Sequence, residues 1–431
     1  MTTPSTRPAV HQVLATLGYG DAIGNEVLGI QTALRLAGYP SDIFVETAET
    51  RLEPLTRDYR DLIDVSRPDN ILLHHFSLGS RASRIAYALP DRMILIYHNI
   101  TPPEYLLGVH RDLVRQCYSG RRELMAYVNR CDLALGDSEF NRQELEEFGF
   151  PRSGVLPVVP SFEHLNEPPD HTLISEFDDG GPNILFVGRV IPNKRIEDVI
   201  RFFYAYKVKH EREARLLLVG SHSGFESYLT SLYHLIATLR VPDVHILGHV
   251  SNATLTACYD VADLFLSASE HEGFCVPLME GFYKRIPVVA YAAAAVPATV
   301  AGAGVLYESK DPRHVAALID TVLSNPALEA EIVRDQDVVL DRMQAEDFNT
   351  VLLRTIEQVQ QSPRCPPVEV RQDFCNDSAN GNASKSFGSL APRPSKRCRS
   401  RPAAVARTPN YRPRERWSSI NGCRPPTGGT R

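Results

Sequence analysis

The chain has 431 residues, of which 43% are hydrophobic and 23% are charged. This length excludes a single ordinary domain and fits two, with enough apolar residues to form two cores. The formal net charge of −6 is unevenly distributed, because the last 70 residues carry 14 Lys or Arg against 4 Asp or Glu. The protein therefore has an acidic body and a basic tail, and its composition is typical of a soluble globular protein.

Cysteine spacing bears on the redox compartment, and one long uncharged run bears on whether the chain crosses a membrane. None of the eight cysteines forms a C-x-x-C pair, so neither a zinc site nor a redox motif is indicated. We expect a reducing, cytoplasmic compartment, since no secretory signal precedes the first strand. The uncharged run at 286–307 is interrupted by prolines and glycines, which favours a strand and loop passage over a membrane span.

Short apolar runs bounded by turn residues recur along the chain, with helical periodicity between most of them. The first series lies at 11–17, 41–46, 70–76, 92–99, 133–138 and 153–159. The second series lies at 184–190, 214–220, 243–248, 262–269, 286–291 and 304–307. Continuous apolar strands alternating with helices indicate parallel sheets covered on both faces. We therefore predict an α/β protein with two facing Rossmann-like, doubly wound domains whose strands end at a common cleft.

Composition also divides the chain. The predicted parts are an N-terminal domain at 1–165, a polar linker at 166–183, a C-terminal domain at 184–344, a final helix at 345–361 that packs back on the N-terminal domain, and a tail at 362–431. The tail is rich in proline and arginine without an apolar period, so we expect it to be disordered. A solvated appendage is favoured over a nucleic-acid arm, because the positive charge lacks a repeated recognition unit.

A glycine-rich loop follows the first strand, but its spacing departs from the dinucleotide fingerprint. Gly18, Gly20 and Gly24 read G-x-G-x-x-x-G, whereas the fingerprint is G-x-G-x-x-G, and the extra residue turns the last glycine away from a pyrophosphate. Glu46 ends the second strand, where a ribose-binding acid would lie, so a nicotinamide enzyme stays an alternative. The loop either supplies backbone N–H groups to a phosphate or only joins strand to helix.

Two basic residues follow the strand at 184–190. The strand ends at Gly188 and Arg189, and Lys194 opens an amphipathic helix five residues after Arg189. A guanidinium fork and an ammonium at the mouth of a sheet can together neutralise a leaving diphosphate without a metal ion. The alternative is ordinary surface charge.

The stretch 262–291 places two acids beside a helix start. Glu272 and Gly273 follow a strand, Pro277 is expected at the first helical position, and Glu280 lies in the first turn. The two carboxylates can each accept two vicinal hydroxyls, one pair from a sugar and one from a ribose. Free N–H groups of 274–278 favour a phosphate between them. A ligand with hexose, diphosphate and ribose in that order is a nucleotide sugar.

These motifs resemble a known family. E-G-F-x-x-P-x-x-E after S-x-S-E, with G-R-x4-K upstream, is similar to the donor half of the retaining glycosyltransferases of family 4 (group 1), which have the GT-B fold. The segments 97–105, 137–142 and 295–307 are similar to further family motifs. The resemblance covers nearly all of residues 11–361.

The resemblance implies roles for individual residues. It assigns Glu272 to the donor hexose, Glu280 to the ribose, and His98 to the sugar near the reacting carbon. The remaining donor-binding positions that it implies are Gly20, Gly24, Gly188, Arg189, Lys194, His249, Val250, Gly273, Phe274, Cys275 and Val276, of which Arg189 and Lys194 hold the diphosphate. Three features depart from the family pattern: Cys275 stands where glycine is usual, Ala298 where glutamate is frequent, and 281–285 replaces a small-residue helix.

The predicted activity is transfer of a hexose, of mannose or glucose type, from a nucleoside diphosphate sugar to a saccharide or lipid-linked acceptor held by the N-terminal domain. Retention of the anomeric configuration is implied by the family alone, and no metal or other cofactor is expected. The alternatives are a nucleotide-sugar epimerase of the same fold, a nicotinamide oxidoreductase, and an inactive sugar-nucleotide-binding scaffold.

Three further features carry less weight. His74 and His75 are adjacent on a strand, so they point to opposite faces and at most one lines the cleft. The D-x-D at 335–337 lies in a late charged helix, which argues against a metal clamp. Five arginines between 109 and 130 alternate with apolar residues. This face either docks on an anionic membrane or a lipid diphosphate, or is a solvated helix face.

Overall fold

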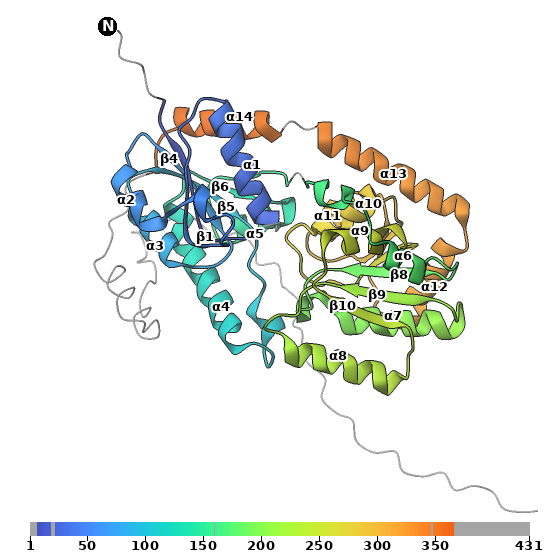
Figure 1. The fold of residues 1–431 in the computed structure, drawn as a ribbon. Helices are drawn as coiled ribbons and strands as arrows, with labels where there is room; N and C mark the ends of the chain where they lie inside the picture. The colour runs from blue at the N-terminus through green and yellow to red at the C-terminus, as the bar shows by residue number, and fades with distance from the viewer. Residues whose placement is uncertain (1–6, 19–21, 159, 346–347, 366–431) are drawn as a thin grey trace, which may run out of the picture. The chain divides into compact units, whose positions relative to one another are not determined.

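The computed structural model describes residues 7–18, 22–158, 160–345 and 348–365 (Figure 1). Gly20 and most of the predicted tail, 366–431, lie outside the described residues. Within them the chain forms two parallel sheets in sequence, so the predicted α/β class with two Rossmann-like, doubly wound domains is confirmed. None of the described helices combines the length and apolar character needed to cross a bilayer.

The first domain is built on a seven-stranded sheet. Its strand order is β3-β2-β1-β4-β5-β6-β7, and every neighbouring pair is parallel. The strands are β1 (Val10–Leu17), β2 (Ile43–Ala48), β3 (Thr56–Asp58), β4 (Ile71–Phe76), β5 (Arg92–Tyr97), β6 (Leu133–Gly136) and β7 (Ser153–Val155). All residues of β4 and β5 are buried, as expected for central strands covered on both faces. The sequence did not predict β3, a three-residue polar strand at the sheet edge.

The second domain is built on a six-stranded parallel sheet of order β10-β9-β8-β11-β12-β13. Its strands are β8 (Asn183–Val187), β9 (Arg215–Val219), β10 (Val244–Gly248), β11 (Leu264–Ser267), β12 (Val288–Tyr291) and β13 (Val305–Tyr307). In both sheets the strand order reverses beside the first strand, at β1/β4 and at β8/β11. Ligands of doubly wound sheets bind beyond the carboxyl ends of the strands at such a switch point.

Helices cover the faces of both sheets. The first domain contains α1 (Ala22–Leu36), α2 (Leu62–Val65), α3 (Arg81–Ala88), α4 (Arg111–Ala126) and α5 (Glu139–Glu147). The remaining helices are α6 (His171–Phe177), α7 (Ile196–Lys209), α8 (Glu226–Leu239), α9 (Asn252–Asp260), α10 (Val276–Tyr283), α11 (Val296–Val300), α12 (Pro312–Leu323), α13 (Pro326–Ala345) and α14 (Phe348–Gln361). The D-x-D of 335–337 lies within α13, where Asp337 pairs with Arg285.

The final helix returns to the first domain. Leu352, Ile356 and Val359 of α14 share a core with strands β1, β4 and β5 and with helix α1. Arg92 secures the end of α14, since its guanidinium donates to the carbonyl oxygens of Gln360 and Ser362. Four residues of the predicted tail, 362–365, therefore lie against the first domain, where the Cys365 amide donates to Asp132.

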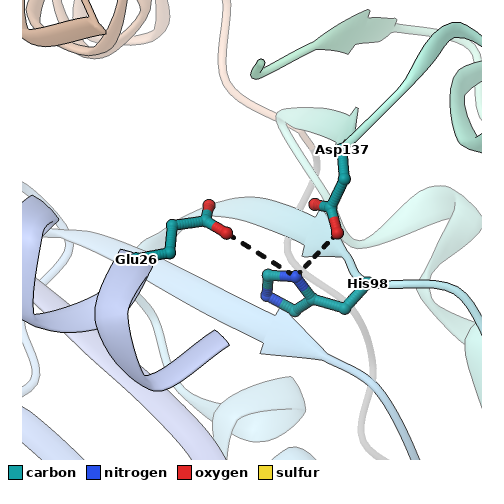
Figure 2. A group of neighbouring side chains, drawn as sticks. All are labelled: Glu26, His98 and Asp137. Atoms are coloured by element: carbon teal, nitrogen blue, oxygen red, sulfur yellow. Dashed lines mark hydrogen bonds and ion pairs between the residues drawn. The ribbon is translucent and has the colours of Figure 1, made fainter. Parts of the chain in front are cut away.

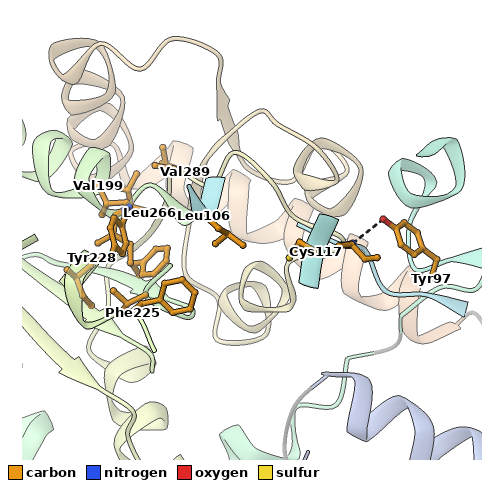
Figure 3. Packing of buried hydrophobic residues seen from close by; sticks show 14 of the residues in the cluster. Tyr97, Leu106, Cys117, Val199, Phe225, Tyr228, Leu266 and Val289 are labelled. Atoms are coloured by element: carbon orange, nitrogen blue, oxygen red, sulfur yellow. Dashed lines mark hydrogen bonds between the residues drawn. The ribbon is translucent and has the colours of Figure 1, made fainter. Parts of the chain in front are cut away.

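The chain between the two sheets belongs to both domains. Phe162 and Leu165 lie within the predicted N-terminal domain at 1–165, but their apolar side chains pack in the core of the second domain. The 3-10 helix η3 (Pro103–Leu106) extends from the first domain toward the second. Leu106 is buried in one cluster with residues of both domains, such as Tyr97 and Leu266 (Figure 3). Burial of this cluster stabilises the contact between the domains.

Candidate active site

A pocket of about 260 Å³ lies between the two domains. Its lining from the first domain is Ala22, Ile23, Glu26, His98, Asp137 and Val158, and from the second domain Lys194 and residues 272–277. Pockets for whole ligands usually enclose roughly 300–1,000 Å³. The volume therefore fits one part of a large ligand, with the rest lying beyond the pocket.

Lys194 and Glu272 meet in this pocket. Lys194 ends the 3-10 helix η6 (Pro192–Lys194), and Glu272 lies in the loop after β11; Nζ of Lys194 is 2.5 Å from Oε1 of Glu272. The side chains are 14% and 9% exposed. Burial acts to lower the pKa of Lys194, but the Glu272 carboxylate outweighs it and the pKa is raised. Lys194 therefore stays charged in a largely dry site. The amphipathic helix that it was expected to open begins at Ile196.

The loop from Glu272 leads directly into α10. The helix starts at Val276, one residue earlier than predicted, and Pro277 takes its second position. Cys275 caps it in the left-handed region, with φ of 76°. This conformation explains why glycine is usual at this position in the family that the sequence resembles. The hydroxyl of Thr299 donates to the carbonyl of Phe274, and residues 274–277 at the start of α10 line the pocket.

The other predicted diphosphate ligand, Arg189, lies outside this lining. Its side chain is exposed, and its guanidinium carbon is 5.8 Å from the centre of the Phe225 ring. Gly188 precedes it at the end of β8, where its amide donates to Val219. Lys194 and Arg189 thus share one edge of the sheet, but only Lys194 reaches the enclosed pocket.

Glu280 lies apart from Glu272, in the second turn of α10. Its two carboxylate oxygens are both engaged, by the Tyr259 hydroxyl at 2.7 Å and by Nε2 of His164 at 2.9 Å. His164 belongs to the 3-10 helix η5 (Glu163–Asn166) and is 28% exposed in its side chain. Neither partner was anticipated from the sequence, because both come from segments without a recognisable motif.

His98 follows β5 and lines the pocket, but both its ring nitrogens bond to protein groups. Nδ1 is 3.0 Å from Asp137, and Nε2 is 2.9 Å from Nδ1 of His75. The resemblance implied that His98 contacts the sugar. In the described structure its polar atoms are turned to Asp137 and His75. His74 lies on the other face of β4 and bonds to Ser83, in agreement with the alternation expected of a strand.

Glu26 and Asp137 were not singled out from the sequence. Glu26 projects from α1 and Asp137 follows β6, and they flank the same ring nitrogen of His98 (Figure 2). Burial, reinforced by Asp137 and opposed by His98, raises the pKa of Glu26 to about 8. The ligand-type atoms of these three residues lie within 4.8 Å of one another, close enough for a metal ion. Within the group, a hydrogen bond joins Nδ1 of His98 to Oδ2 of Asp137.

Direct hydrogen bonds join the Glu272 loop to the first domain. The Ser138 hydroxyl donates to the carbonyl of Gly273 at 2.6 Å, and Nε2 of His271 is 2.6 Å from Oδ1 of Asn99. A Cβ atom on Gly273 would lie 2.9 Å from Cβ of Asn99. Only glycine permits this approach, so the role of Gly273 is to let the two domains meet.

Four predicted positions remain. Gly24 is buried near the start of α1, while Gly20 lies outside the described residues. His249 and Val250 follow β10; His249 is exposed and Val250 packs against the core of the second domain. None of the three described residues lines the enclosed pocket.

Part of the chain matches a known family model. Residues 171–336 match the family model described as "Glycosyl transferases group 1". The matched region contains Lys194, Glu272 and Glu280, whereas Glu26, His98 and Asp137 lie before it.

Two curated relatives are mannosyltransferases. The O-antigen chain mannosyltransferase B of Escherichia coli is 24% identical over 274 residues, which are 61% of this chain and 65% of that protein. The GDP-mannose-dependent alpha-mannosyltransferase of Mycolicibacterium smegmatis is 29% identical over 112 residues, 26% of each chain. The chain thus spans less than two thirds of the length of either relative.

A solved structure shares the fold of the whole described body. The Anabaena protein HepE in complex with UDP-glucose superposes with a TM-score of 0.65 at 15% identity, covering 81% of this chain and 99% of that chain. At this identity the likeness shows the fold alone, which is GT-B. The region that matches the group 1 model therefore lies in the second half of a GT-B fold.

Proposed function

We propose that the protein transfers a hexose, of mannose or glucose type, from a nucleoside diphosphate sugar to a hydroxyl of a saccharide or lipid-linked acceptor. The observation that carries this proposal is the Lys194–Glu272 pair, held beside the start of α10 in the pocket between the domains. The mannosyltransferase relatives and the UDP-glucose complex of the structural neighbour support the choice of donor class.

The pair has the charges that both parts of such a donor need. When the donor enters, the Lys194 ammonium exchanges Glu272 for the anionic diphosphate, and the released carboxylate accepts sugar hydroxyls. During transfer, negative charge builds on the diphosphate while the sugar becomes cation-like. Lys194 and the positive end of α10 favour this separation, which lowers the barrier. The same groups supply the positive charge without a metal ion, so we propose a metal-independent reaction.

Retention of the anomeric configuration belongs to the same proposal and rests on the sequence resemblance. We propose that Arg189 and Glu280 bind the parts of the donor that extend beyond the pocket, the distal phosphate and the ribose. A membrane-bound acceptor would meet the basic face at 109–130, although two of its arginines are occupied: Arg121 pairs with Glu144, and Arg130, which lies beyond α4, donates to three backbone carbonyls. The exposed arginines of this face are Arg111, Arg115 and Arg122.

The test uses the full chain with GDP-mannose and UDP-glucose as probes. A ligand that binds only the folded state raises the unfolding midpoint, so one probe should do so in wild type and not in Lys194→Met. The sugar-labelled form of that probe, incubated with saccharide acceptors in the presence of EDTA, should then give a glycosylated product with the donor's anomeric configuration. Binding with no transfer and no donor hydrolysis would indicate a scaffold, and an altered free sugar an epimerase.

A further inference from the structure

The protonation state of His98 follows from a chain of buried hydrogen bonds that begins at Gln12. Nε2 of Gln12 donates to the carbonyl oxygen of Val27 at 3.0 Å. Because a backbone carbonyl only accepts, this bond fixes the orientation of the amide. The other end, Oε1, lies 3.0 Å from Nε2 of His75. An amide oxygen also only accepts, so Nε2 of His75 carries a proton.

The position of the proton on His75 determines which nitrogen of His98 must donate. His75 is buried, and burial together with the charge of His98 holds its pKa well below the usual range. The ring is therefore neutral, and with the proton on Nε2 its Nδ1 is an acceptor. Nδ1 of His75 faces Nε2 of His98 at 2.9 Å, so Nε2 of His98 must donate. Nδ1 of His98 donates to the Asp137 carboxylate at 3.0 Å. Both nitrogens of His98 carry protons, which makes the ring an imidazolium.

Two carboxyl groups balance this cation. Asp137 accepts its proton, and Glu26 lies 3.8 Å from the same nitrogen with a side chain that is only 9% exposed. A second ionised carboxylate would leave a net negative charge in a buried cluster, which is costly. The raised pKa of Glu26 agrees with this balance, since at neutral pH the group keeps its proton. One imidazolium, one carboxylate and one carboxylic acid sum to zero charge.

We propose that Glu26, His98 and Asp137 form a charge-neutral, hydrogen-bonding wall of the donor pocket, which receives hydroxyl groups of the sugar without repelling the adjacent diphosphate. Gln12 and His75 are positioning residues, which keep His98 charged through their chain of hydrogen bonds. The neutral Glu26 offers one donor and one acceptor to a hydroxyl, whereas an ionised Glu26 would face the anionic donor with a negative charge. This inference rests on the proposed donor class.

Other ionisable groups share the pocket with Glu26. From the first domain these are His98 and Asp137, and from the second Lys194, Glu272 and Cys275. The pKa of Lys194 is raised by Glu272, and burial raises the pKa of the Cys275 thiol well above its usual value. Deprotonation of Glu26 is distinguished from that of the remaining groups by comparison with Glu26→Gln.

The first experiment measures donor affinity by isothermal titration calorimetry from pH 6.5 to 9.5, with whichever of GDP-mannose and UDP-glucose binds. Wild-type affinity should be constant at low pH and fall above about pH 8, by up to roughly tenfold per pH unit. Glu26→Gln keeps a neutral hydrogen-bonding side chain, so its affinity should stay flat. The Gln variant also corrects for ionisation of the nucleotide base. A flat wild-type profile, or the same fall in both proteins, would overturn the proposal.

The second experiment needs no donor, so its result is independent of the proposed function. In protein labelled with ¹⁵N-histidine, the His98 signals are identified by their loss in His98→Gln. Both ring nitrogens should be protonated at pH 7. His75→Asn retains an acceptor near the Nδ1 position and should preserve that state, whereas His75→Leu should convert His98 to the neutral form. A neutral His98 in folded wild type would refute the charge-neutral wall even if the donor binds.

Discussion

The hydroxyl of Ser138 donates a 2.6 Å hydrogen bond to the carbonyl oxygen of Gly273. Ser138 is also the N-cap of α5, where its oxygen accepts from the Asn141 amide. One side chain thus starts a helix of the first domain and holds the Glu272 loop of the second. This bond lies beside residues that we propose meet the donor, so it holds the two halves of the proposed site together.

Ser138→Ala should lower turnover by about tenfold, because it removes one hydrogen bond of the closed site as well as the helix cap. Ser80→Ala is the matched control. Ser80 caps α3 through the Ser83 amide and has no hydrogen bond to the second domain among the described contacts. Both variants should lose about 1 kcal/mol of stability. Steady-state kinetics and urea unfolding check this, and equal turnover in the two variants would contradict it.

Lys194→Met should reduce turnover by about two to three orders of magnitude, since it removes the buried positive charge and leaves Glu272 without its partner. Lys284→Met is the control, because Lys284 pairs with Asp260 at similar exposure away from the pocket and should retain near wild-type turnover. Arg189→Ala should have a smaller effect than Lys194→Met, because the Arg189 guanidinium is exposed. The measurement is donor hydrolysis and transfer at saturating donor.

Removal of His164 should increase affinity for a nucleoside diphosphate if Glu280 binds the ribose. In the described structure His164 occupies one Glu280 oxygen, so His164→Ala frees it for a ribose hydroxyl. Tyr259→Phe should act in the opposite direction, since the Tyr259 hydroxyl orients the other oxygen of Glu280. Each change should be about tenfold or more, since one hydrogen bond to a charged group contributes roughly 1.5–3 kcal/mol. Calorimetric titration with GDP and UDP reads this out, and equal affinities in both variants would argue against Glu280 as the ribose ligand.

Cys275→Gly should stabilise the fold by up to about 1 kcal/mol, because a left-handed conformation costs a non-glycine residue about this much. Cys275→Ala keeps the unfavourable conformation and removes the thiol, so it separates the two effects and should give no gain. The comparison of urea midpoints for the three proteins decides the point. A higher midpoint for the alanine variant than for the glycine variant would show that the thiol, not the backbone, is the destabilising element.

Stability should fall between pH 4.5 and 7 through Glu123 of α4. Burial, opposed by Arg84, raises the pKa of Glu123 to about 7. A carboxyl group with a higher pKa in the folded state than in the unfolded state stabilises the fold below its unfolded pKa, and this contribution is lost as the pH rises through the folded value. The loss is about 3 kcal/mol over that range. Glu123→Gln should remove it, so the wild type and the variant should differ more in urea midpoint at pH 8 than at pH 5.

Much of the fold could be predicted because the strands that build it are continuous apolar runs. Those of β4 and β5 are buried from end to end, and such runs leave a clear pattern. The strand β3 left none, since Thr56 to Asp58 are polar residues at a sheet edge. The buried position of Arg130 could not be predicted either, because the backbone carbonyls to which it donates belong to Tyr87 and Leu89, far away in the sequence.

The site divides in the same way. Lys194 and Glu272 follow the paired strands β8 and β11, so a sequence that reveals the strands also predicts that their ends converge. Glu26 is on a helix, and its proximity to His98 depends on how α1 packs on the sheet. An acid among the apolar residues of α1 was the available signal. Gln12 and His75 are buried strand residues that only the three-dimensional hydrogen-bond chain distinguishes from core positions.

The return of α14 to the first domain has a practical consequence. Both ends of the described chain pack in the first domain, at β1 and beside Cys131. The second domain is therefore an insertion within the first. An inserted domain can be replaced as a unit, with the junctions placed at η5 and at the end of α13, while the core of the first domain stays intact. Under the proposed function, chimaeras with the corresponding half of a relative would test whether the second domain alone selects the donor.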